Sequence, residues 1–185
     1  MTTLERQVAF ATTEKRKTYP PGSIRFDLWM CLFSGWFLLG LYLDGWAHNH
    51  GRVDDTFFTP WHAVLYSGYL AVALHLMFSY ARNTFKGYDW MHALPVGYMA
   101  ALFGVVIFGF GGGFDMVWHQ TFGFEENTEA LLSPSHLLLA LGAFLYVTAP
   151  LRAAWIRKSA RGWRDLLPVV LTLTYLICLF TELAL

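Results

Sequence analysis

The sequence predicts an all-α integral membrane protein of about five transmembrane helices, with two duplicated helical hairpins followed by a fifth helix. Three features support this prediction: a high apolar content, apolar runs of membrane-spanning length, and loops that alternate in charge. Of the 185 residues, 56% are hydrophobic and only 14% are charged, whereas roughly half of a soluble domain is apolar. This composition favours helices packed within a bilayer.

The apolar residues are concentrated in five runs of roughly twenty residues. A helix rises 1.5 Å per residue, so this length crosses a hydrocarbon core of about 30 Å. The runs are Leu28–Ala47, His62–Ala81, His92–Phe114, His136–Trp155 and Leu166–Leu185. We therefore expect a basic N-terminal segment over residues 1–25 and a single membrane domain over residues 26–185. Within that domain, the first hairpin covers 26–84, the second covers 90–157 and the last helix covers 165–185.

The charged residues predict how the chain is oriented in the membrane. Of the 13 lysines and arginines, all except Arg52 fall before the first run, after the second, or at the end of the fourth and beyond it. The loops on the opposite side hold the acidic residues Asp54, Asp55, Glu125, Glu126 and Glu129. Cytoplasmic loops are enriched in Lys and Arg. The sequence therefore predicts a protein of the cell membrane with its N-terminus in the cytoplasm.

One motif occurs twice, once in each predicted hairpin. The first copy reads Asp44-Gly-Trp-Ala-His48, then Asp54-Asp55, then Thr59-Pro60-Trp61-His62. The second reads Asp115-Met-Val-Trp-His119, then Glu125-Glu126, then Ser133-Pro134-Ser135-His136. Each copy has an aspartate and a histidine four residues apart, an acidic pair, and a Thr/Ser-Pro-x-His sequence. An internal duplication of a helical hairpin is the simplest explanation.

The spacing within each copy brings three metal-binding side chains together. Residues four apart lie on one face of a helix, with Cβ atoms about 5–6 Å apart. Thr59 and Ser133 are favourable N-caps, and proline is tolerated at the first helical position. His62 and His136 should therefore lie in the first turn of the returning helix. A hairpin places that turn beside the end of the helix before it.

These residues form two candidate metal sites near the extracytoplasmic face. The predicted ligands are Asp44, His48 and His62 in the first hairpin and Asp115, His119 and His136 in the second. Two imidazoles and one carboxylate, with other coordination positions open, are typical of a redox-active copper or iron site or of a catalytic zinc site. We expect the run Gly111-Gly112-Gly113 either to allow close helix packing or to let the helix deform beside the second site. Nothing in the sequence indicates a nucleic-acid or nucleotide site.

Other histidines and acidic residues have simpler interpretations. We interpret His50, His75 and His92 as interfacial residues rather than metal ligands. We expect the acidic loop residues to form a solvated rim. The alternative is that they are outer partners of the metal ligands or an entrance that attracts cations.

At the motif residues, the sequence resembles the C subunit of the copper membrane monooxygenases, the family of particulate methane monooxygenase and ammonia monooxygenase. The resemblance rests on Asp44 and His48 followed by Asp-Asp-Thr-Phe-Phe-Thr-Pro-Trp-His62, and on Met116-Val-Trp118-His119 with Ser133-Pro134-Ser135-His136. It covers about residues 40–70 and 112–140. Elsewhere the similarity is limited to hydrophobic segments.

The resemblance implies specific roles for these residues. It implies that Asp44, His48 and His62 bind copper, and that His119 and His136 belong to a neighbouring copper site. Asp115 is a departure, because the family has Asn or another residue there. The family's activity would be O₂ activation for oxidation of a small substrate such as ammonia or a hydrocarbon. Copper is then the expected metal, with iron or zinc as alternatives, and we expect an oligomer with partner monooxygenase subunits.

Two other functions are compatible with the same motif. A membrane metal-handling or transport protein would continue its ligands through the bilayer, for which His75 and Glu182 are the candidates. A structural subunit would use the bound ions only to pin the ends of its helices.

Overall fold

The computed structural model describes residues 19–51, 58–122, 133–157 and 162–182. In these ranges the chain is helical, without strands, and it contains five helical spans long and apolar enough to cross a membrane. The spans are α2 (Ile24–Asn49), α3 (Pro60–Phe85), α4 (Met99–Phe122), α5 with α6 (Pro134–Val147 and Ala149–Arg157) and α7 (Trp163–Glu182). The predicted five-span, all-α fold class is confirmed.

The predicted helix starts at the two motifs are also confirmed. The Thr59 hydroxyl accepts a hydrogen bond from the backbone N–H of His62 at 3.0 Å, and Ser133 accepts one from His136 at 3.3 Å. Each cap satisfies an N–H that has no partner within the helix and contributes about 1 kcal/mol. Both histidines therefore lie in the first turn of a returning helix, α3 or α5.

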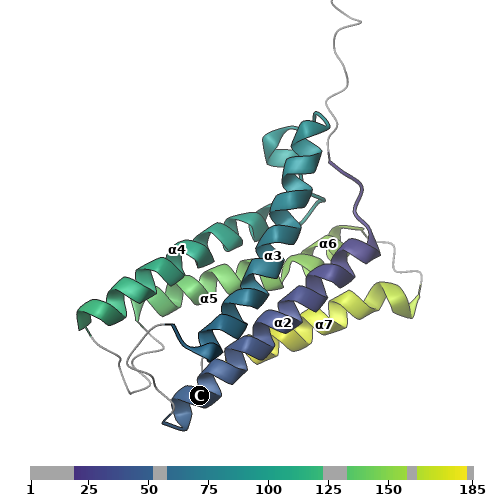
Figure 1. The fold of residues 1–185 in the computed structure, drawn as a ribbon. Coiled ribbons are helices and arrows are strands. Elements are labelled where there is room, and N and C mark those ends of the chain that lie inside the picture. The colour runs from purple at the N-terminus through teal and green to yellow at the C-terminus, as the bar shows by residue number, and fades with distance from the viewer. Residues whose placement is uncertain (1–18, 52–57, 123–132, 158–161, 183–185) are drawn as a thin grey trace, which may run out of the picture.

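The bundle consists of two hairpins and a fifth helix. Helices α2 and α3 form the first hairpin, α4 and α5 form the second, and α7 packs along α2 (Figure 1). The end of α7 lies at the same end of the bundle as the end of α2 (Figure 1). A central aromatic cluster joins the hairpins, since the ring of Phe37 lies 5.3 Å from those of both Phe108 and Tyr146.

A buried ion pair holds the other end of α2. The carboxylate of Asp27, in the first turn of α2, is 1% exposed and pairs with Arg157 at the end of α6. It also accepts a hydrogen bond of 2.7 Å from the hydroxyl of Tyr98, just before α4. The fold therefore satisfies this buried charge within the protein.

Two element boundaries differ from the sequence prediction. The third apolar run begins at His92, but α4 begins only at Met99, because Pro95 and the positive-φ residue Gly97 (φ 93°) interrupt the helix. The fourth span is broken at Thr148, because Pro150 has no N–H to continue the helical hydrogen bonds. Arg152 stabilises the break by donating to the carbonyl oxygens of Leu145, at 2.5 Å, and Gly97, at 3.1 Å.

The outward surfaces of the helices are strongly apolar. Large exposed side chains on these surfaces include Trp29, Leu39, Phe78, Phe110, Ile177 and Phe180. Such a surface is expected where helices contact lipid. Several charged residues on which the predicted membrane orientation depends lie outside the described residues: Arg6, Lys15, Arg16, Lys17, Arg52, Asp54, Asp55, Glu125, Glu126, Glu129, Lys158 and Arg161.

Close packing within the first hairpin depends on glycine. A Cβ atom at Gly68 of α3 would lie 2.5 Å from the backbone of Phe37 in α2, and one at Gly40 of α2 would lie 2.5 Å from the Cα of Leu65. Helices that pack in lipid use small residues in this way to bring their backbones together.

We predict that Gly68→Ala destabilises the protein by about 1–3 kcal/mol, because the added methyl group forces the two backbones apart. Gly113→Ala is the matched control, since nothing lies within 4 Å of a Cβ atom there. Equilibrium unfolding of both variants in detergent micelles measures the difference. Equal stabilities would contradict the packing described for this hairpin.

Candidate metal centre

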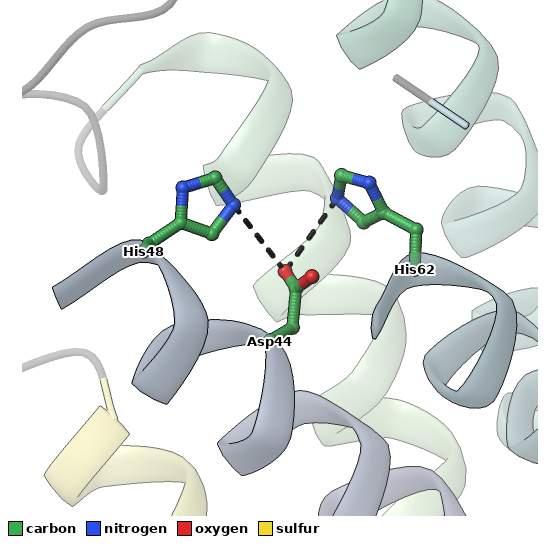
Figure 2. Close-up of side chains that lie close together, drawn as sticks. All are labelled: Asp44, His48 and His62. Atoms are coloured by element: carbon green, nitrogen blue, oxygen red, sulfur yellow. Dashed lines mark ion pairs between the residues drawn. The ribbon is translucent and has the colours of Figure 1, made fainter. Parts of the chain in front are cut away.

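The first predicted triad is assembled where α2 ends and α3 begins. Asp44 and His48 lie one turn apart on α2, and His62 faces them from the first turn of α3 (Figure 2). The Nε2 atoms of His48 and His62 lie 3.7 and 3.5 Å from the same oxygen, Oδ2 of Asp44. Asp44 and His62 are largely buried, whereas the side chain of His48 is 44% exposed. The cluster is therefore open on the His48 side.

The second predicted triad repeats this arrangement between α4 and α5. Nε2 of His119 and Nδ1 of His136 each lie 3.5 Å from Oδ1 of Asp115. This triad is more deeply buried, since the side chains of Asp115 and His119 are only 5% and 11% exposed. The structure thus brings together all six predicted site residues, three in each hairpin.

The geometry of both triads fits a cation. In each group, one ligand atom from every residue lies within 4.8 Å of the others. The histidine-to-carboxylate distances of 3.5–3.7 Å exceed the usual hydrogen-bond length. They are close to the spacing of about 3.3 Å between two N or O ligands of one tetrahedral ion. In addition, Oδ1 of Asp44 is buried without a hydrogen-bond partner, an arrangement that a bound cation would stabilise.

Two serine hydroxyls contact the second triad. Ser135 donates a hydrogen bond of 2.7 Å to Oδ1 of Asp115, and Oγ of Ser133 lies 2.8 Å from Nδ1 of His136. A partner that holds a metal ligand in position, as Ser135 does, tunes metal affinity. Ser133 contacts the same nitrogen of His136 that faces Asp115, so a bound ion would replace this contact. The sequence predicted Ser133 only as a cap and indicated no role for Ser135. The difference between the two copies of the motif could have indicated this role, because the second copy has the hydroxyl group of Ser135 where the first has the indole ring of Trp61.

The two triads are neighbours. The charge of Asp44 interacts with those of Asp115 and His136, and His136 in turn interacts with His48. Tyr66, one turn beyond His62, interacts with both aspartates. The two sites therefore lie near enough for the charges of one to act on the other.

The glycine run before Asp115 leaves space for the side chain of Tyr66. The hydroxyl of Tyr66 lies 2.6 Å from the position of a Cβ atom at Gly112, and Gly111 packs against Leu139 of α5 with a corresponding distance of 3.3 Å. The expected role of these two glycines in close packing is confirmed. Gly113 has no such neighbour.

The other histidines lie apart from the two triads. Nδ1 of His50 lies 2.8 Å from the carbonyl oxygen of Trp46, and His92 pairs with Asp89 at 3.0 Å. His75 packs its ring against Phe26 and Phe33 inside the bundle. Within the described ranges none of the three belongs to a triad, as predicted, but His75 lies among aromatic rings of the bundle and not at the interface.

Comparison with known proteins gives no relative for this chain. No family model, curated protein or solved structure matches it. The assignment of function therefore depends on the residues and their geometry.

We predict that the purified protein binds two equivalents of a divalent metal, and that His48→Ala and His119→Ala each bind one. Each substitution removes a ligand from one triad and leaves the other intact. His50→Ala, two residues from His48 and outside the triad, is the control and should retain both equivalents. Elemental analysis after dialysis against metal measures the stoichiometry.

Loss of both equivalents in either ligand variant would show a single shared centre. Retention of both in the two variants would exclude the triads as binding sites.

Proposed function

We propose that this chain is the copper-binding subunit of a membrane monooxygenase, which activates O₂ to oxidise a small substrate such as ammonia or a hydrocarbon. One observation carries the proposal: two adjacent Asp/His/His triads lie in the duplicated hairpins of one membrane protein. When bound, copper would supply the redox chemistry with O₂. The protein would supply the ligands, their orientation and an apolar environment.

The donor atoms support a redox-active metal with open coordination positions. Each triad offers two imidazoles and one carboxylate, so positions remain for an exogenous ligand. Among divalent first-row metals, sites with nitrogen and oxygen ligands bind copper most tightly. Both cysteines make their contacts elsewhere in the fold, since Cys31 hydrogen-bonds to the carbonyl of Pro168 and Cys178 lies beside Tyr42. We therefore favour copper over iron or zinc.

The resemblance of the motifs to the copper membrane monooxygenases supports the same proposal. On the same grounds we propose partner subunits and an oligomer. The large apolar surface of the helices is available to contact them. The distribution of basic residues supports a cytoplasmic N-terminus. With that orientation the triads would lie near the extracytoplasmic face.

A transport function receives less support from the geometry. A path for ions requires successive ligands through the bilayer. His75 is packed among aromatic rings, and Glu182 lies beside the first triad rather than deeper in the bundle. The behaviour of the His62→Ala variant distinguishes a structural role for the metals from the proposed function.

We predict that the copper-loaded protein, after reduction, is reoxidised by O₂, and that His62→Ala loses this reactivity in proportion to the copper lost from the first site. We expect this because O₂ reacts at an open coordination position of a copper ion that the protein holds, and His62→Ala removes a ligand of that ion. The Cu(II) electron paramagnetic resonance signal before reduction, after reduction and after exposure to O₂ measures the effect. His92→Ala is the control.

Copper that stays reduced in air, or a protein that takes up only zinc, would contradict the monooxygenase assignment. If His62→Ala lowered the stability of the protein but left the rate of reoxidation unchanged, the metals would have the structural role instead.

A further inference from the structure

A second carboxylate lies beside the first triad and comes from the fifth helix. Glu182, in the last turn of α7, packs against Gly45, the residue that follows Asp44 in α2. A Cβ atom at Gly45 would collide with Oε1 of Glu182 and would lie 3.2 Å from its Cδ. The absence of a side chain at Gly45 therefore creates the space that the Glu182 carboxylate occupies.

Hydrogen bonds from α2 hold the end of α7 in this position. The hydroxyl of Tyr42 donates to the carbonyl oxygen of Cys178 at 2.9 Å and lies 2.5 Å from Oγ1 of Thr181. Because Tyr42 and Gly45 lie three residues apart, they share one face of α2. The packing that fixes Thr181 thus also holds Glu182 against Gly45, the residue next to Asp44 of the first triad.

The two carboxylates form an unfavourable pair unless a cation lies between or beside them. The Glu182 carboxylate lies against Gly45, the residue next to Asp44, so the negative charge of Asp44 acts on it, and both groups are partly withdrawn from solvent. Within the described ranges, neither forms an ion pair with lysine or arginine. Buried like charges are destabilising, and ionisable groups at membrane depth require a partner. A divalent cation at the first triad would neutralise both.

In the part of the chain that the structure describes, the second triad has no carboxylate from the fifth helix beside it. Asp115 is the one carboxylate of that group, and it accepts a hydrogen bond from Ser135. With neutral histidines, a divalent ion in the first triad with Glu182 has no net charge. The same ion in the second triad leaves a net charge of about +1.

We propose that Glu182 is an outer carboxylate of the first metal site, which makes this site the tighter of the two for a divalent cation. The inference rests on the proposed metal-binding function of the triads. The Glu182 oxygens lie outside the group of mutually close ligand atoms formed by Asp44, His48 and His62. Glu182 is therefore a positioning and charge-setting residue, and the two duplicated sites differ because the fifth helix places this carboxylate against Gly45 of the first hairpin.

The test is a titration of the full-length protein in detergent with Cu²⁺ alone, against a competing chelator. Glu182→Gln should weaken the first site by roughly 10–100-fold and leave the second unchanged, as is typical when an outer partner of a metal ligand is removed. Gly45→Ala should have the same effect, because the new methyl group displaces the carboxylate. Gly113→Ala, in open space two residues before Asp115, should leave both affinities unchanged.

A readout without metal separates this role from a structural one. The metal-free Glu182→Gln variant should unfold at the same temperature as the unaltered protein or at a higher one, because the substitution removes repulsion between carboxylates. A lower unfolding temperature would show that Glu182 stabilises the helix end and would overturn the proposal.

The outcomes also separate this inference from the proposed function. If the unaltered protein binds two ions and Glu182→Gln binds both with unchanged affinity, the inference alone fails. If the unaltered protein binds no ion, the proposed function fails, and the inference fails with it.

Discussion

The rest of the site depends on one electrostatic constraint, the burial of an aspartate in a membrane helix opposite the start of the returning helix. A carboxylate withdrawn from water is disfavoured unless a cation compensates it. Asp44 in α2 and Asp115 in α4 are both largely buried. The histidines opposite them lie in the first turns of α3 and α5, which the Thr59 and Ser133 caps fix in place. Each hairpin therefore joins a buried carboxylate that needs a cation to imidazoles that can bind one.

Duplication of the hairpin doubles this arrangement, and the surrounding residues then make the two copies different. The hydroxyl groups of Ser133 and Ser135 form hydrogen bonds with the second triad. Glu182 adds negative charge to the first. Tyr66 lies where it interacts with both aspartates, next to the space left by Gly112. The two sites thus share a ligand set and differ in charge and in hydrogen bonding.

The five spans, the capped starts of α3 and α5, and the grouping of the six site residues could all be predicted from the sequence. These features depend on local spacing, on hydrophobic length and on a motif that occurs twice. The break at Thr148 and the late start of α4 were not predicted, because they depend on which prolines and glycines the packed bundle accommodates within an apolar run. The position of Glu182 beside Gly45 depends on how α7 packs against α2, which no periodicity along the chain reveals.

The central claim is that each hairpin directs one carboxylate and two imidazoles at a common metal ion. Anomalous X-ray diffraction from crystals of the copper-loaded protein, recorded on both sides of the copper absorption edge, tests it most directly. We expect two copper peaks in the anomalous difference map, one enclosed by Asp44, His48 and His62 and the other by Asp115, His119 and His136. Copper bound only elsewhere on the protein, or triads with their side chains turned away from one another, would contradict it.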